Sequence, residues 1–189
     1  MKKTITLIML FSCSIHIASA QFYKKLQAPD TFSDSISIIV QDFKKNFSTI
    51  EGDQLQSRGE TDVYRSKVTI PGSLHCAIYR FHSVEDTTAS WQAIMYEGES
   101  YEEAIKIYKT TFRQLKNSKI KWVEKNNISF EGDLEMPGEN IRFAVTPLRL
   151  NITDRPYLDF FGEIELISSY DGWEVHLNLH NKKSDADQY

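Results

Sequence analysis

Two amphipathic segments that match each other at a constant spacing constrain the fold of this chain more than any other feature. In both segments, apolar residues recur at spacings of three and four and therefore share one helical face. One offset of 65 residues relates the matched pairs, which are Ile36 and Tyr101, Ile39 and Ala104, Val40 and Ile105, Phe43 and Tyr108, Phe47 and Phe112, and Ile50 and Leu115. The pattern predicts two helices, over about 33–50 and 101–115, in corresponding positions of two similar halves.

The start of the second helix carries a signal of its own. Ser100 is followed three residues later by Glu103, which is the spacing of a capping box. In that motif the serine hydroxyl accepts a hydrogen bond from the amide of the glutamate, and the glutamate reaches back. We therefore expect the second helix to begin directly after Ser100.

A Pro-Gly pair follows the first helix and recurs after the second one, at Pro71-Gly72 and Pro137-Gly138. Proline followed by glycine suits the centre of a type II turn, and we expect each pair in a hairpin loop slightly longer than two residues. Short strand patterns precede the two turns, at 68–70 and 134–136. Alternating apolar residues follow them, namely Leu74, Cys76 and Ile78 in the first half and Ile141, Phe143 and Val145 in the second.

A third strand closes each half, at 91–96 and 157–167, so the sequence predicts one helix and three antiparallel strands twice over, in residues of about 31–98 and 99–180. Two further strand patterns lie in the second half. Residues 120–123 are expected to pair with 128–136, and Asp171-Gly172 is a hairpin signal after the third strand. The predicted fold class is α+β: an antiparallel sheet with both amphipathic helices packed on one face, in a single domain over residues 21–180.

The first twenty residues have the order of a cleavable export signal. Lys2 and Lys3 precede an apolar run, and Ala18-Ser19-Ala20 supplies small residues at a cleavage site. We expect cleavage between Ala20 and Gln21 and a periplasmic or extracellular product. The alternative is a lipoprotein anchored at Cys13, since Leu10 lies three residues before that cysteine.

Composition excludes several classes of protein. Removal of Lys2 and Lys3 with the signal changes the formal net charge from −4 to −6, and the basic clusters that nucleic acid requires are missing, so no nucleic-acid partner is expected. No later stretch is apolar enough for a transmembrane helix. Cys76 is the single cysteine after cleavage, so an internal disulfide is ruled out. We expect Cys76 to be a small residue of the core. Residues 181–189 form a polar tail that we expect to be flexible.

No common catalytic or cofactor-binding motif occurs, so no catalytic residue, metal ion or cofactor is assigned. A two-residue turn at Asp171-Gly172 would place Glu165 opposite Asn178 and Glu163 opposite His180. The polar face of this hairpin provides the candidate ligand-binding residues, which are Phe161, Glu163, Glu165, His176 and His180. Histidines and carboxylates on one face could act as an acid–base pair or bind a metal, although an ordinary solvated sheet face explains the same pattern.

Six aromatic residues suggest a groove for sugar rings or apolar ligands, namely Trp91, Trp122, Trp173, Tyr79, Tyr96 and Phe161. Phe161 is of particular interest because it falls on the polar face of the hairpin. The expected function is a non-catalytic binding module for an unidentified small ligand or protein partner. One alternative is an exported hydrolase, metal-assisted or not, that uses Glu163, Glu165, His176 and His180. The other is a structural component of the cell envelope.

Overall fold

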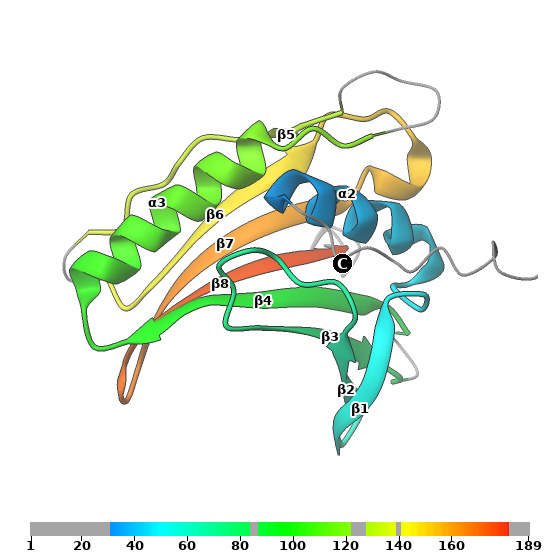
Figure 1. Ribbon diagram of the computed structural model, residues 1–189, viewed down its shortest axis with the longest axis horizontal. Coiled ribbons are helices and arrows are strands. Elements are labelled where there is room, and N and C mark those ends of the chain that lie inside the picture. The colour runs from blue at the N-terminus through cyan, green and yellow to red at the C-terminus, as the bar shows by residue number, and fades with distance from the viewer. Residues whose placement is uncertain (1–30, 84–86, 122–127, 139–140, 182–189) are drawn as a thin grey trace, which may run out of the picture.

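A computed structural model describes residues 31–83, 87–121, 128–138 and 141–181 of the chain. Within them, eight strands form one antiparallel sheet, and two α-helices lie on one of its faces (Figure 1). The α+β class, the antiparallel sheet and the position of the helices are thus confirmed. In the described part of the chain, no helix is both long enough and apolar enough to span a membrane.

The sheet order is β1-β2-β3-β4-β8-β7-β6-β5. The first four strands follow the first helix, and they are β1 (Glu51–Arg58), β2 (Thr61–Ser66), β3 (His75–Phe81) and β4 (Ala89–Gly98). The last four follow the second helix, and they are β5 (Phe130–Glu131), β6 (Phe143–Leu150), β7 (Phe160–Ser169) and β8 (Gly172–Asn181). Each helix is therefore followed by four described strands, whereas the sequence predicts a repeated unit of three with two further strand patterns in the second half. The last strands of the two halves, β4 and β8, pair at the centre. A common origin of the halves stays a prediction.

Helix α2 (Phe32–Asp42) begins at Thr31, whose hydroxyl accepts a hydrogen bond from the Asp34 amide at 3.1 Å. It ends at Asp42 and passes into the short helix η1 (Phe43–Lys45), so the prediction that this helix continues to residue 50 is wrong. The Asp42 carboxylate explains the end, because it accepts hydrogen bonds from the Thr49 and Ile50 amides of the returning chain at 3.0 and 3.2 Å. Phe47 and Ile50 are nevertheless buried, as their apolar spacing indicates.

Helix α3 (Tyr101–Asn117) starts where the sequence predicts, and the Ser100 hydroxyl accepts a hydrogen bond from the Glu103 amide at 3.2 Å. Its buried face packs on β4, β7 and β8 and touches α2. Gly162 of β7 permits this close approach, because a Cβ atom at that position would lie 2.8 Å from Cδ2 of Leu115. Helix α3 thus fixes the centre of the sheet from one side.

The sheet face beneath the helices, here called the covered face, carries most of the core. Alternate residues of the central strands are buried there, including Trp91, Ala93, Ile164, Leu166, Val175, Leu177 and Leu179. The opposite face, here called the open face, carries the intervening residues of the same strands. Successive strand residues point to opposite faces, so the two faces are chemically distinct although they share one backbone.

Several predicted strands differ from the structure. Residues 68–70 lie in the connection between β2 and β3, while the mostly polar segments 51–58 and 61–66 form β1 and β2. The Pro71-Gly72 turn is present, with a hydrogen bond from the Ser73 amide to the Ile70 carbonyl at 3.0 Å and a φ of 86° at Gly72. Of the predicted strand at 128–136, only β5 at 130–131 is formed, beside an isolated bridge between Ile120 and Ile128, and residues 122–127 lie outside the described part.

The apolar alternation after the second Pro-Gly pair indicates the wrong buried face for β6. Phe143 is 55% exposed, whereas Thr146, Leu148 and Leu150 are buried. Thr146 can face the core because its hydroxyl lies 2.6 Å from the Tyr108 hydroxyl in a buried hydrogen bond. A satisfied threonine thus occupies a position at which an apolar residue is expected.

Candidate functional site

The hairpin of β7 and β8 sets the geometry of the candidate residues. Ser169 pairs with Gly172, so Tyr170 and Asp171 form the turn, and the predicted turn at Asp171-Gly172 is wrong. Neither turn residue has a positive φ, which excludes the primed turn that Asp-Gly favours, and the positive φ of 141° falls at Gly172 instead.

The true register is displaced by two residues from the predicted one. Glu163 lies opposite Asn178, and Glu165 lies opposite His176, whereas we expected Glu163 opposite His180 and Glu165 opposite Asn178. A displacement of two residues keeps every side chain on its predicted face. The candidates therefore do share the open face, with different cross-strand neighbours.

The central β4–β8 pairing adds Gln92 and Ser90 of β4, which no sequence pattern singles out. Gln92 of β4 lies opposite Asn178 of β8, and β3 lies next to β4 with Tyr79 opposite Ser90. Residues far apart in the chain therefore meet on four adjacent strands, in the order β3, β4, β8 and β7.

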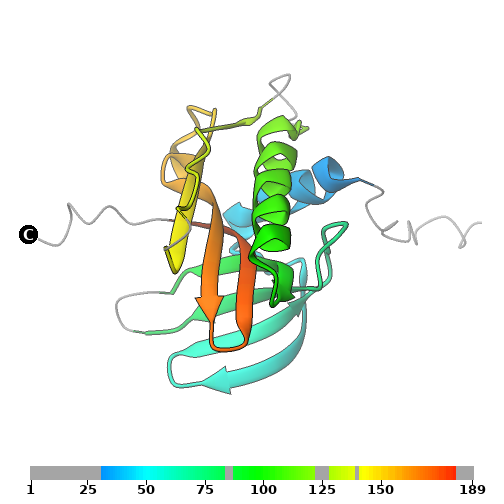
Figure 2. The same ribbon diagram turned by 90° about the vertical axis from the view of Figure 1, so that its left-hand side faces the viewer.

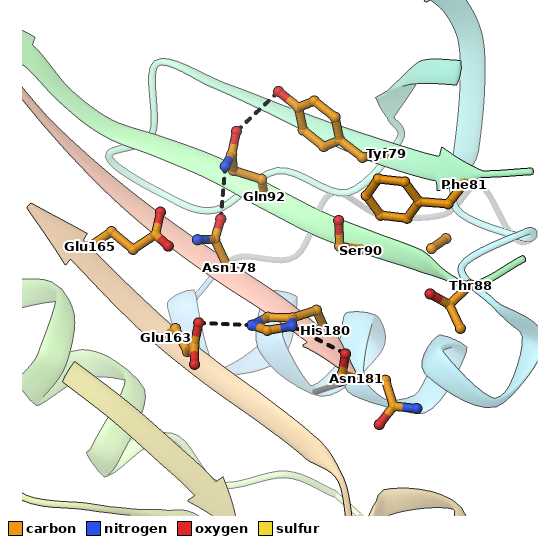
Figure 3. Close-up of a pocket in the computed structure, with 11 residues that line it drawn as sticks. Tyr79, Phe81, Thr88, Ser90, Gln92, Glu163, Glu165, Asn178, His180 and Asn181 are labelled. Atoms are coloured by element: carbon orange, nitrogen blue, oxygen red, sulfur yellow. Dashed lines mark hydrogen bonds and ion pairs between the residues drawn. The ribbon is translucent and has the colours of Figure 1, made fainter. Parts of the chain in front are cut away.

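These four strands and their ends border an open pocket of about 430 Å³ on the open face. This volume lies within the range of about 300–1,000 Å³ that is usual for small-molecule sites. The pocket is lined by Tyr79, Phe81, Thr88, Ala89, Ser90, Gln92, Glu163, Glu165, Asn178, His180 and Asn181. Figure 3 shows the two aromatic rings along one side, Glu163, Glu165 and His180 on the other, and Ser90, Gln92 and Asn178 between them.

Glu163 and His180 form an ion pair in this pocket. Nε2 of His180 lies 3.0 Å from Oε2 of Glu163, and Nδ1 lies 3.3 Å from the Asn181 carbonyl oxygen. Both partners are hydrogen-bond acceptors, and an imidazole can donate from both nitrogens only when it is protonated. The side chain of Glu163 is only 9% exposed, so the pair is largely withdrawn from water.

The electrostatics of His180 agree with this geometry. Burial alone lowers the pKa of His180, but the hydrogen bond and negative charge of Glu163, the Asn181 carbonyl and the charge of Glu165 together raise that pKa above its ordinary value. The imidazolium form is thereby favoured more than it is in an isolated histidine. A protonated His180 with both nitrogens engaged acts as a fixed positive group and is poorly suited to be a general base.

A second set of hydrogen bonds orients the amides in the pocket floor. The Tyr79 hydroxyl donates to Oε1 of Gln92 at 3.0 Å, and Nε2 of Gln92 donates to Oδ1 of Asn178 at 2.8 Å. This chain joins β3, β4 and β8, and it determines which way both amide groups point. The polar floor is therefore held in place by its own side chains.

His176 and Phe161 do not line the pocket. Nε2 of His176 lies 2.8 Å from Oε2 of Glu174, and its Nδ1 lies 3.8 Å from Oε2 of Glu165. Phe161 is 9% exposed, with the guanidinium of Arg149 4.9 Å from its ring centroid. Three of the five candidates, Glu163, Glu165 and His180, thus lie at the pocket, His176 supports its rim from the side, and Phe161 is covered.

The described tryptophans and the cysteine considered from the sequence are not among the residues that line the pocket. Trp91 is fully buried and donates to the Ser66 hydroxyl at 2.9 Å. Trp173 packs against Tyr101 with the ring planes tilted by 57° and 4.8 Å between centroids, and Trp122 lies outside the described residues. Cys76 is 4% exposed, and burial raises the pKa of its thiol. Among the described residues, no three His, Cys, Asp or Glu side chains are grouped so that they could hold a metal ion.

The arrangement is suited to hydrogen bonding with a polar molecule against an aromatic side. No protein-family model, no curated protein and no solved structure matches the chain. The chemistry of the pocket itself is therefore the basis for a functional assignment.

Proposed function

We propose that this chain is an exported, non-catalytic binding module that holds a small polar ligand in the pocket on its open sheet face. Export rests on the signal pattern of residues 1–20, and a periplasmic or extracellular location follows from it. The single observation that carries the binding role is the pocket of about 430 Å³ lined by oriented polar side chains and two aromatic rings.

Preorganisation supports binding over catalysis. Gln92 and Asn178 are held by hydrogen bonds to each other and to Tyr79, and His180 is held by Glu163 and the Asn181 carbonyl. Fixed donors and acceptors reduce the entropy that a site loses when a ligand binds. The pocket thus has the properties of a recognition site before any ligand arrives.

A thermal-shift screen tests the proposal with protein expressed from the full chain. The panel contains neutral saccharides, polyamines, organic anions, lipids and divalent metal salts. At least one class is expected to raise the melting temperature, because a ligand that binds only the folded state stabilises it. A rise that persists in Glu165→Gln, or the absence of any rise, would contradict the proposal. Glu97→Gln is the matched control, since Glu97 is an exposed residue of β4 outside the pocket.

The export part has its own test. The protein recovered outside the cytoplasm of a bacterial host should begin at Gln21, as determined by intact mass. A product with a lipid on Cys13 would support the lipoprotein alternative in place of cleavage after Ala20. A product that still contains Met1 would contradict export by this segment.

A hydrolase is the second candidate, and one observation favours it. Glu163, Glu165 and His180 meet in a single pocket, as acid–base chemistry requires. Panels of chromogenic glycosides and esters would reveal it through turnover that Glu163→Gln and Glu165→Gln each reduce at least about a hundredfold, the usual contribution of a general acid or base. Ligand binding without turnover would exclude this candidate.

A further inference from the structure

Side-chain chemistry changes in one direction across the pocket. Strand β3 contributes the aromatic rings of Tyr79 and Phe81, the central strands β4 and β8 contribute Ser90, Gln92 and Asn178, and β7 contributes the carboxylates (Figure 3). Three interstrand spacings separate β3 from β7, which is about 14 Å along the sheet at about 4.8 Å per strand. A ligand that touches both sides must therefore be elongated.

Three polar groups in the pocket have no hydrogen-bond partner among the described residues. They are the Ser90 hydroxyl, Nδ2 of Asn178 and the carboxylate oxygens of Glu165, one of which lies 3.8 Å from Nδ1 of His176, beyond hydrogen-bond distance. The orientation of Asn178 is fixed, since its Oδ1 accepts from Gln92, so Nδ2 can act only as a donor to a ligand. The ligand must thus accept from Asn178 and donate to Glu165.

Charge narrows the class of ligand. His180 forms an ion pair with Glu163, but the carboxylate of Glu165 makes one side of the pocket acidic. This side repels phosphates and carboxylates. An alkylammonium ion would pair with Glu165, yet it has no lone pair to accept from Asn178. A hydroxyl group donates and accepts, and it satisfies all three free groups. The aromatic side would meanwhile contact an apolar ring face.

We infer that the pocket binds a neutral oligosaccharide of at least two rings, with one ring against Phe81 and the hydroxyl groups of the next directed to Ser90, Asn178 and Glu165. This inference rests on the proposed binding function and names its ligand class. It assigns recognition roles to Phe81 and Ser90.

Isothermal titration calorimetry with defined neutral oligosaccharides tests the inference. The probes are α- and β-linked oligomers of two to six units of glucose, galactose, mannose and N-acetylglucosamine, compared with spermidine and with glucuronic acid oligomers. Wild-type protein should bind at least one neutral oligomer more tightly than its monosaccharide. Phe81→Ala and Glu165→Gln should each weaken that binding about tenfold, through loss of the ring contact and of the charged acceptor.

Matched controls separate the pocket from the rest of the sheet. Phe143→Ala removes an exposed aromatic side chain of β6, and Glu97→Gln removes an exposed carboxylate of β4, so both should leave binding unchanged. Glu165→Gln preserves side-chain size, and it keeps the test valid if Phe81→Ala fails to fold.

Each other outcome has a defined meaning. Binding of spermidine or of the acidic oligomers, with no binding of any neutral oligomer, would overturn the saccharide inference while the proposed binding function stands. Neutral binding that Glu165→Gln leaves intact would overturn the assigned contacts. If no probe of any class binds, the saccharide inference fails, and the proposed binding function fails with it only if the thermal-shift panel also gives no rise in melting temperature.

Discussion

The two faces of the central sheet are built from alternate residues of the same strands, yet they exclude water by different means. On the covered face, Ile164, Leu166 and Val175 are buried beneath α3 by hydrophobic packing. On the open face, Glu163 is 7% exposed although neither described α-helix lies over it. Burial of a carboxylate costs free energy unless a partner compensates for it, and His180 is that partner. The comparison shows that burial depends on hydrophobic packing on the covered face and on a charged partner at Glu163 on the open face.

The shape of the sheet contributes to this difference. Figures 1 and 2 show that the sheet is strongly twisted, so β1, β2 and β3 swing away from the plane of β6 and β7. Twist is general in antiparallel sheets. Here β3 and β7 provide the two sides of the pocket, and its floor lies on β4 and β8.

The largest expected effect is a loss of stability from a substitution in the core of the covered face. Trp91→Ala removes a fully buried indole and its hydrogen bond to Ser66, and it should reduce the free energy of unfolding by about 3–5 kcal/mol in urea titrations. Phe143→Ala, on the exposed side of β6, should change it by less than about 0.5 kcal/mol. Similar losses in the two variants would contradict the position of the core.

The second largest effect is a loss of stability when the Glu163–His180 ion pair on the open face is removed. Glu163→Gln leaves a half-buried imidazole without its charged acceptor, and the free energy of unfolding should fall by about 1–3 kcal/mol. Glu97→Gln should be neutral within about 0.5 kcal/mol, because Glu97 is exposed. If Glu163→Gln is equally neutral, the pair contributes nothing to stability.

The sequence anticipates the covered face better than the open one, and the reason is physical. Apolar spacing identifies Ala104, Tyr108 and Leu115 as the buried side of α3, and Ser100 marks its start, because both signals are local. The end of α2 depends on hydrogen bonds from the Thr49 and Ile50 amides to the Asp42 carboxylate. The spacing of apolar residues carries no information about these bonds.

The open face depends on pairing between distant strands. Alternation places Glu163, Glu165, His176 and His180 on one face, but it does not determine the register, which the turn at Tyr170 and Asp171 sets. Gln92 reaches the site only because β4 pairs with β8, more than eighty residues along the chain. Its value as a site residue is therefore visible only in the folded chain.

The third effect is the pH dependence of the stability that His180 contributes on the open face. The pKa of His180 is raised in the folded protein, so its stabilising contribution is complete below the unfolded pKa of about 6.5 and is lost as the pH rises through the folded value. Urea titrations from pH 5.5 to 9 should show the difference in stability between wild-type protein and His180→Gln shrinking as the pH rises. A difference that grows with pH would show that the folded pKa is lowered.

The smallest effect probes the floor of the pocket. Tyr79→Phe removes the hydroxyl that donates to Gln92, and the free energy of unfolding should fall by about 0.5–1.5 kcal/mol. Tyr170→Phe is the matched control, because the fully exposed Tyr170 has no hydrogen-bond partner among the described residues. Equal values for the two variants would mean that the hydroxyl does not hold the floor in place.

Chemical-shift mapping by ¹H–¹⁵N NMR tests the central claim most directly, since it reports where on the sheet a ligand binds. Pools of the ligand panel are added to the labelled protein, and the amide signals of β3, β4, β7 and β8 are compared with those of α2 and α3. The account predicts saturable shifts that cluster at Phe81, Ser90, Glu165, Asn178 and His180, and that disappear in Glu165→Gln. Shifts confined to the helices, or no saturable shift with any pool, would contradict a ligand site on the open face.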